Sequence, residues 1–319
     1  MKKILITGAA GYLGARLSKY LAENGNSVTA FIRSNVSKNC EWAKLMKEVI
    51  VGDIRDEKIV TDLAKRNFDV VIHLISLDHH KSEDSPIFVS SINVIPTWNL
   101  LDSFTKNGLG KFIYFSTQQV LGELPSRLIE ETTEPNPKNN YGLTHLLSEE
   151  IVNYYNNKTN TKCINARLSS GYGSPVFNQN NCWWLVINDL CKTAFTKNKI
   201  KLLSDGSPQR DFIHILDICR AIEIMIESGS NYDENIFHIA SGKTLNILEL
   251  AHIVKKVFSE RYSKEIPIYL PDESVSNNSN KFKDSERFMI DIKRIKELGF
   301  QNKVSLQAGV NEIFEYFDS

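Results

Sequence analysis

The feature that most constrains the fold is a glycine-rich turn close to the start of the 319-residue chain. A short apolar run, Ile4–Ile6, leads directly into Thr7-Gly8-Ala9-Ala10-Gly11-Tyr12-Leu13-Gly14, and a helical pattern follows. The first glycine permits a tight turn, the second lets backbone amides approach a phosphate, and the third lets helix and strand pack closely. The helix amino terminus adds partial positive charge there, so strand, turn and helix together predict a site for a dinucleotide pyrophosphate. The residues expected to contact it are Gly8, Gly11, Tyr12, Leu13 and Gly14.

Short β-branched runs alternate with longer helix-patterned stretches as far as about Phe177. The alternation is typical of a parallel sheet with crossover helices, and continuous apolar runs indicate strands that are covered on both faces. We therefore predict a Rossmann-type, doubly wound α/β sheet in residues 1–177. The expected strands are Ile4–Ile6, Val28–Ile32, Val49–Val51, Val70–Leu74, Phe112–Phe115 and Cys163–Leu168, and the expected helices are Leu13–Leu21, Ile59–Ala64, Ile92–Phe104 and Tyr141–Tyr155.

The regular alternation stops near Asn178, and short isolated strands, Ile200–Leu203 and Ile236–Ile239, are expected among longer helices. We expect residues 178–319 to form a smaller, mainly helical substrate-binding lobe, with the chain able to cross between the lobes. The stretch Pro271–Ser285 is polar and turn-rich, which predicts a surface loop.

The charge balance limits the possible partners. Thirty-eight basic and thirty-eight acidic residues give a formal net charge of zero, so neither nucleic acid nor a membrane surface is expected as a partner. The first apolar run is too short for a signal peptide and no later run approaches a membrane span, which favours the cytoplasm. The five cysteines are scattered without a C-x-x-C pair, so we expect reduced thiols and no metal site.

The end of the second strand bears on the choice of cofactor. An acidic residue there binds the adenosine ribose, whereas an arginine pairs with a 2′-phosphate. Ile32 stands where the acid would be, and Arg33 follows it. NADP(H) is therefore favoured, with Arg33 as a phosphate contact, and NAD(H) stays possible.

Further motifs follow the glycine turn in order. They are Gly52-Asp53-Ile54-Arg55-Asp56, Ile72-His73-Leu74, Asn93-Val94-x-x-Thr97-x-Asn99-Leu100-Leu101, Arg210-Asp211-Phe212-Ile213-His214-x-x-Asp217-Ile218 and Arg287-Phe288-Met289-Ile290-Asp291. With the turn, they make the chain resemble the extended short-chain dehydrogenase/reductase family of nucleotide-sugar epimerases, dehydratases and reductases over nearly its whole length. The resemblance implies a nucleotide-diphosphate sugar as substrate and a homodimer formed through the helices around Ile92–Phe104 and Tyr141–Tyr155.

The resemblance also implies roles for single residues. Asp53 and Ile54 would contact the adenine, and Leu74, Ile75 and Ser76 would lie along the cofactor. The residues expected to contact the substrate are His79, Gln118, Arg210 and Arg287. Arg167 is expected to be structural, and Trp183 and Trp184, in an expected helix Asn181–Phe195, are expected in the core.

Thr117 and Tyr141 would form a hydroxyl pair at the reacting carbon. Thr117 would hold the sugar oxygen, and Tyr141 would exchange a proton with it while hydride moves between sugar carbon and nicotinamide. Family members lower the pKa of this tyrosine with a lysine four residues later, where this chain has His145. Position i+4 on a helix lies on the same face as position i, so His145 should still face the cofactor.

Three interpretations of His145 stay open: an active enzyme with altered acid–base tuning, a weak enzyme with a tightly held cofactor, and a binding protein without turnover. Reduction is the direction least harmed, because a protonated tyrosine needs no prior phenolate to donate its proton. Gln118 and Gln119 replace the acidic pair of the family's 4,6-dehydratases, which disfavours dehydration.

The leading hypothesis is therefore an NAD(P)-dependent reduction of a 4-keto (deoxy)sugar nucleotide. One alternative is a C4 epimerase or dehydrogenase with tightly bound NAD(H). The other is a non-catalytic dinucleotide-binding or scaffold protein.

Overall fold

The computed structural model describes residues 1–34, 40–124, 127–229, 234–271 and 287–319. The chain divides into two compact units. The first comprises Met1–Glu123, Glu131–Leu168 and Ala221–His238, and the second comprises Leu124–Glu130, Ser169–Arg220 and Ile239–Ser319. The first compact unit thus gives way to the second after Leu168, and the functional division expected near Phe177 stays a prediction. The expected loop Pro271–Ser285 lies, after its first residue, outside the described residues.

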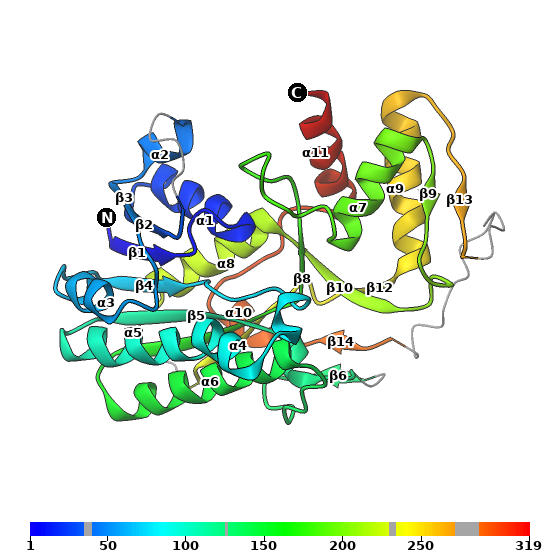
Figure 1. The fold of residues 1–319 in the computed structure, drawn as a ribbon. Helices are drawn as coiled ribbons and strands as arrows, with labels where there is room; N and C mark the ends of the chain where they lie inside the picture. The colour runs from blue at the N-terminus through cyan, green and yellow to red at the C-terminus, as the bar shows by residue number, and fades with distance from the viewer. Residues whose placement is uncertain (35–39, 125–126, 230–233, 272–286) are drawn as a thin grey trace. The chain divides into compact units, whose positions relative to one another are not determined.

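The first unit is built on a seven-stranded sheet of order β11-β7-β5-β4-β1-β2-β3 (Figure 1). Its strands are β1 (Lys3–Thr7), β2 (Ser27–Ile32), β3 (Glu48–Val51), β4 (Val70–His73), β5 (Lys111–Thr117), β7 (Lys162–Leu168) and β11 (Ile236–Ile239). Each pairing from β7 to β3 is parallel, and β1, β4 and β5 are almost completely buried. The Rossmann-type sheet predicted from the apolar runs is confirmed.

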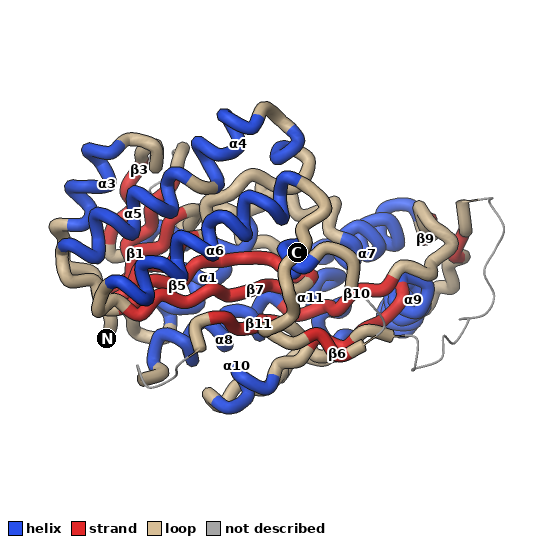
Figure 2. Tube along the Cα trace, turned by 90° about the horizontal axis from the view of Figure 1, so that it is seen from below, coloured by secondary structure: helices blue, strands red, loops and turns tan. Residues whose placement is uncertain are grey.

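Helices cover both faces of this sheet (Figure 1). They are α1 (Tyr12–Glu23), α2 (Glu41–Leu45), α3 (Glu57–Ala64), α4 (Pro86–Asn93), α5 (Ile95–Lys106), α6 (Asn140–Lys158) and α8 (Ile215–Glu227), with 3-10 turns η1 (Lys81–Glu83) and η2 (Gln118–Leu121). Helices α3, α5 and α6 lie along one face and α1 along the other, and Figure 2 shows α6 running beside β5 and β7. The core under α5 and α6 joins Leu100 and Phe104 to Val71 and Phe112.

The strand order identifies one point of the sheet where a ligand is expected to bind. The chain order reverses between β1 and β4, which lie side by side, and open α/β sheets bind ligands beyond the carboxyl ends of strands at such a point. The glycine turn follows β1, and the Leu74–Ser76 segment follows β4. The fold thus brings two segments expected to contact the cofactor to one edge of the sheet.

The second unit has its own core of helices and small sheets. Its strands are β6 (Leu128–Ile129), β8 (Ser170–Tyr172), β9 (Ile200–Lys201), β10 (Gln209–His214), β12 (Thr244–Asn246), β13 (Ile268–Tyr269) and β14 (Met289–Ile290), and its helices are α7 (Val186–Lys197), α9 (Ile247–Tyr262), α10 (Lys293–Glu297) and α11 (Leu306–Asp318). The small sheets have the orders β12-β10-β8, β13-β9 and β14-β6. Helices α7, α9 and α11 pack on one another through Leu190, Val254 and Phe314.

Two predictions of secondary structure are wrong in the first unit. The helix expected over Ile92–Phe104 is two helices, because the chain breaks at Val94 and Pro96 has no backbone N–H with which to continue the α4 ladder. The strand Ile236–Ile239 is not isolated, because it forms the β11 edge of the seven-stranded sheet.

The helix expected over Asn181–Phe195 begins only at Val186, so both tryptophans precede it. Trp183 packs against the core, with its ring centroid 5.0 Å from that of Phe317. Trp184 is 45% exposed, so its expected place in the core is wrong. None of the helices in the described part of the chain combines the length and hydropathy that a bilayer span requires.

Candidate active site

The glycine turn has a geometry that side chains would prevent. Gly8 has a φ of +75°, a conformation that L-residues rarely adopt. A Cβ on Gly14 would lie only 2.2 Å from the Gly8 carbonyl oxygen. Helix α1 begins after Gly11, which offers no side-chain cap, and its first turn carries no acidic residue. The amide end of α1 is therefore suited to an anion such as a pyrophosphate.

A cavity of about 170 Å³ lies beside this turn, within the first unit. It is lined by Gly8, Gly11, Tyr12, Leu13, Gly14, Leu74, Ser76, Phe115, Ser116, Tyr141, His145 and Leu168. Four elements contribute to these walls besides the turn: the ends of β5 and β7, the segment after β4, and the first turns of α6. The cavity brings the glycine turn together with the tyrosine and the histidine expected at the reacting centre.

Not every predicted residue lines this cavity. Ile75 lies behind the turn, where a Cβ on Gly8 would be 3.2 Å from its side chain. Asp53, Ile54, Arg33 and Thr117 are likewise absent from the lining.

Three residues of the lining escaped sequence reasoning: Phe115, Ser116 and Leu168. The apolar run predicted β5 only as far as Phe115, whereas the strand continues to Thr117. They could have been predicted from their position at the carboxyl ends of parallel strands, where open α/β sheets bind ligands.

Tyr141 stands in the first turn of α6, close to the end of β5. A Cβ on the next residue, Gly142, would lie 2.4 Å from the Gln119 carbonyl oxygen, which shows how closely α6 approaches η2. Burial raises the pKa of the Tyr141 phenol to about 12, opposed by a hydrogen bond with the Thr117 side chain and reinforced by the Asp78 carboxylate. The phenol is therefore a proton donor at neutral pH.

His145 lies one turn further along α6 and is 2% exposed. Its Nδ1 is 2.9 Å from the Tyr141 carbonyl oxygen, which can only accept, so Nδ1 carries the hydrogen. Burial lowers the pKa of the imidazole to about 4, so it is neutral at physiological pH and Nε2 is a hydrogen-bond acceptor. The rings of Tyr141 and His145 are 4.3 Å apart, and the histidine places no positive charge beside the phenol.

Buried Asn93 connects the loop after β4 to α6. Its Oδ1 accepts a hydrogen bond from the Leu77 backbone, and its Nδ2 donates to Thr144 Oγ1 at 3.0 Å. The Ser148 hydroxyl donates to the Asn93 carbonyl oxygen. Two walls of the cavity are thus held in register by one side chain.

The residues expected at the adenosine end form a charged group. Asp53 accepts hydrogen bonds from Arg55, with Nε 2.9 Å from Oδ1. This pairing lowers the pKa of Asp53 to about 2, and the charge of Arg33 contributes in the same direction. Exposed Arg33 therefore lies within electrostatic reach of a carboxylate that Arg55 already pairs.

Of the four expected substrate contacts, two belong to the first unit. His79 is partly exposed in the loop after β4, and its ring centroid lies 4.0 Å from that of His80, with the two rings tilted by 37°. Burial lowers the pKa of His79. Gln118 is 9% exposed and its Nε2 donates a hydrogen bond to the Arg167 carbonyl oxygen at 3.3 Å.

The other two belong to the second unit, beside β12. Arg210 is exposed and donates to the Gln209 carbonyl oxygen. Arg287 pairs through both Nη groups with Glu249, at 2.6 and 3.0 Å, and also donates to the Thr244 carbonyl oxygen. The Arg287 guanidinium is thus already engaged in an ion pair within its own unit.

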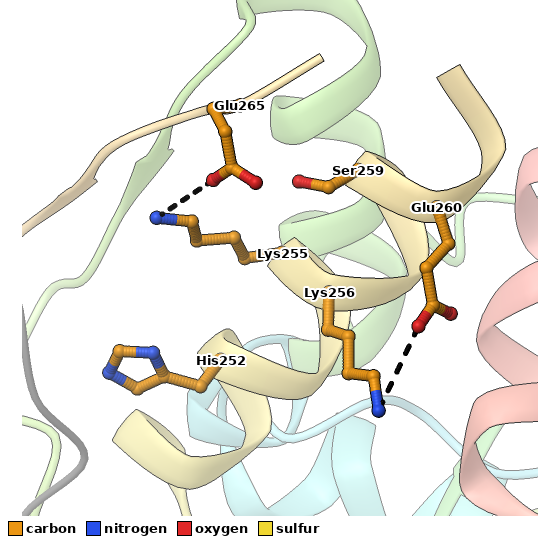
Figure 3. A pocket seen from close by; sticks show the side chains of 6 residues that line it. All are labelled: His252, Lys255, Lys256, Ser259, Glu260 and Glu265. Atoms are coloured by element: carbon orange, nitrogen blue, oxygen red, sulfur yellow. Dashed lines mark ion pairs between the residues drawn. The ribbon is translucent and has the colours of Figure 1, made fainter. Parts of the chain in front are cut away.

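A hollow of about 360 Å³ on the outer surface of α9 is the larger of the two described cavities (Figure 3). Its lysines are paired with carboxylates, Lys255 with Glu265 at 3.3 Å and Lys256 with Glu260 at 3.7 Å. It holds none of the residues expected at the reacting centre, whereas the cavity at the glycine turn holds Tyr141 and His145 and is therefore the better candidate for chemistry. All five cysteines are free, and the described residues contain no cluster of three or more metal-binding side chains.

The sheet, the glycine turn and the tyrosine over the cavity define a class, that of dinucleotide-binding α/β oxidoreductases. The sequence matches the model of the NAD dependent epimerase/dehydratase family over residues 4–240. The chain belongs to this family, which confirms the resemblance and the expectation of an oxidoreductase or epimerase.

Relatives and solved structures agree with this assignment. A UDP-glucose 4-epimerase of Mycoplasma genitalium is 28% identical over 80% of this chain and 81% of its own length. A dTDP-glucose 4,6-dehydratase of Streptomyces niveus is 24% identical over 99% and 92%. The crystal structure of UDP-glucuronic acid 4-epimerase from Bacillus cereus in complex with UDP-glucuronic acid and NAD shares the fold with a TM-score of 0.78, at 23% identity over 99% and 98% of the two chains.

Proposed function

We propose that this protein reduces a keto group of a nucleotide-activated sugar, at C4 of a deoxy-sugar, with a nicotinamide dinucleotide as reductant. The observation that carries the proposal is the state of the residues over the cavity. Tyr141 is held as a protonated phenol, and the neighbouring His145 is a neutral acceptor without charge. At neutral pH such a phenol carries the proton that a reduction must supply, whereas the phenolate that an oxidation needs as its base is scarce.

The residues of the cavity fit the dinucleotide. The turn at Gly8 and Gly14 leaves room that a Cβ would fill, and the uncapped start of α1 suits the pyrophosphate. The bound nicotinamide would supply hydride to the sugar carbon. His145 Nε2 accepts a hydrogen bond from a ribose hydroxyl, Thr117 holds the sugar oxygen, and Tyr141 gives that oxygen its proton as the C=O bond becomes an alcohol.

The pKa directions set the pH dependence. The phenol is the active form of Tyr141 and persists up to its raised pKa of about 12. His145 keeps its acceptor down to about 4. The pH profile of the reduction rate should therefore contain no step from the ionisation of either residue between about pH 5 and pH 11.

For the cofactor we favour NAD(H) over the NADP(H) that Arg33 alone indicates. The Asp53 carboxylate is already paired with Arg55, so the charges at this end do not exclude either cofactor. The epimerase of Bacillus cereus is described in complex with NAD. NADP(H) stays the alternative, and a comparison of the affinities of the protein for NAD and NADP tests it.

UDP-sugars are the first substrates to test, since relatives and fold neighbours carry them in their names. The experiment follows NADH absorbance with a panel of UDP- and dTDP-4-keto-6-deoxy-sugars, using Tyr141→Phe as the paired variant. Net NADH oxidation by the wild type and at least a hundredfold loss in the variant are expected. Turnover that is unaffected by Tyr141→Phe would overturn the assigned role.

A C4 epimerase with retained NAD(H) is the second candidate, and the names of the relatives favour it. An epimerase would interconvert UDP-sugars with no net NADH consumption. It would also need its tyrosine as a base in the oxidative half, which the neutral His145 does not assist. Chromatography of UDP-glucose and UDP-galactose after incubation separates the two candidates.

We further propose that the protein is a homodimer formed through α5 and α6. These helices expose large apolar side chains: Ile95 at 45%, Trp98 at 50%, Leu143 at 46%, Leu147 at 45% and Tyr154 at 52%. An apolar face of this kind on a monomer favours association with a second copy.

A further inference from the structure

A buried ion pair supports the inner wall of the cavity. Arg167 on β7 and Glu149 on α6 are 2% and 1% exposed. Arg167 Nε and Nη2 lie 2.9 and 2.8 Å from the two carboxylate oxygens, and Nη1 donates to the Glu131 carbonyl oxygen. A pair so fully buried and bonded is rigid, and it fixes β7 against α6.

The carboxylate has a third partner, which is one of the residues that line the cavity. Ser116 Oγ donates to Glu149 Oε1 at 2.5 Å, and the β5–β7 register places Ser116 directly beside Arg167. Glu149 lies four residues after His145, on the same face of α6. One carboxylate therefore ties together the ends of two strands and the helix that carries the proposed proton donor.

This arrangement fixes the direction of the Ser116 hydroxyl. A carboxylate that is paired with a guanidinium has no hydrogen to give, so the hydroxyl hydrogen points at Glu149. Ser116 is one of the residues that line the cavity, and its hydroxyl oxygen then has only lone pairs to offer to a ligand. His145 Nε2 is the second acceptor in the same wall.

We propose that Ser116 is a cofactor-binding residue, which accepts a hydrogen bond from the nicotinamide-riboside half of the dinucleotide, and that Glu149 and Arg167 are positioning residues that hold it as an acceptor. That half of the ligand presents ribose hydroxyl and carboxamide N–H donors. Ser116 adjoins Thr117 and shares the cavity with Tyr141, whereas the pyrophosphate belongs at the glycine turn. The inference rests on the proposed function only in requiring that the dinucleotide bind here.

The test titrates NAD and, separately, ADP onto wild type and Ser116→Ala by calorimetry. ADP lacks the nicotinamide-riboside half. Loss of one hydrogen bond should weaken NAD binding about 3- to 10-fold and leave ADP binding unchanged. Unchanged NAD binding, or an equal loss for both ligands, would overturn the proposal.

Tyr155→Phe is the matched control. It removes a hydrogen bond between α6 and Asp102 on α5, and Tyr155 is not part of the cavity. It should alter neither affinity. If Tyr155→Phe lost as much affinity for NAD as Ser116→Ala, and none for ADP, any disturbance of α6 would have the same effect. The proposal would then fail.

Glu149→Gln probes the positioning role, with thermal unfolding to verify that it folds. If Glu149→Gln folds, its affinity for NAD should fall while its affinity for ADP stays unchanged. If it does not fold, the Ser116→Ala titration alone tests the contact between Ser116 and the cofactor. Selective NAD binding by a protein that reduces no keto sugar would contradict the proposed function and leave this inference standing. Reduction of a keto sugar, together with wild-type NAD affinity in Ser116→Ala, would contradict this inference and leave the proposed function standing.

Discussion

Replacing His145 by lysine tests how the histidine sets the chemistry of Tyr141. The neutral imidazole leaves the phenol with its pKa raised to about 12, and the two rings are 4.3 Å apart. An ammonium group at this position would stabilise the phenolate. The expected result is a Tyr141 that ionises at lower pH and a faster oxidative direction.

The magnitude follows from Coulomb's law. Two unit charges about 5 Å apart, at an effective dielectric of about 20, interact by about 3 kcal/mol. This is equivalent to about a hundredfold increase in the ionisation constant of the phenol. Burial of the ammonium at a position that is 2% exposed will reduce the gain, so about tenfold is the smallest effect consistent with the reasoning.

The assay is a pH titration of ring-labelled tyrosine by NMR, with the Tyr141 signal assigned from Tyr141→Phe. His145→Met is the control, because methionine resembles lysine in length but carries no charge. The lysine variant should titrate at lower pH than the methionine variant. Identical titrations would refute the claim that residue 145 faces the phenol.

Three further predictions follow from the structure. Gly14→Ala should abolish detectable NAD binding in calorimetry, because its Cβ would lie 2.2 Å from the Gly8 carbonyl oxygen. Gly229→Ala is the control and should bind NAD as the wild type does, because its Cβ would have no atom within 4 Å. Wild-type NAD binding by both variants would refute the packing argument. Arg33→Ala should change the affinities for NAD and NADP by the same factor, and a loss confined to NADP would reveal a 2′-phosphate contact and overturn the preference for NAD(H). Trp98→Glu should convert a dimer to a monomer in sedimentation experiments, and an unchanged dimer would place the interface elsewhere.

The local sequence predicted the central sheet well because its physical causes are local. Apolar β-branched runs identified the strands, and Gly8 and Gly14 identified the turn. The break at Val94 was missed because Ile92–Phe104 reads as one apolar helical pattern unless Pro96 is given more weight. Residues 236–239 could not be assigned to the large sheet, since their partner strand lies about seventy residues earlier.

The site was predictable in part for the same reason. Tyr141 and His145 share a helix face by spacing alone, and the structure places both at the cavity. Ser116 was missed because its significance depends on Glu149, which is close only after folding. Likewise the sequence could not reveal that Arg287 is engaged by Glu249.

Hydride transfer is the most direct test of the central claim. The protein is incubated with NADH that carries deuterium at C4 of the nicotinamide and with a UDP-4-keto-6-deoxy-sugar, and the sugar nucleotide is analysed by mass spectrometry. The account predicts one deuterium on the reduced sugar carbon and its loss in Tyr141→Phe. An unlabelled, unreduced sugar across the UDP and dTDP panel, with NADH bound, would contradict it.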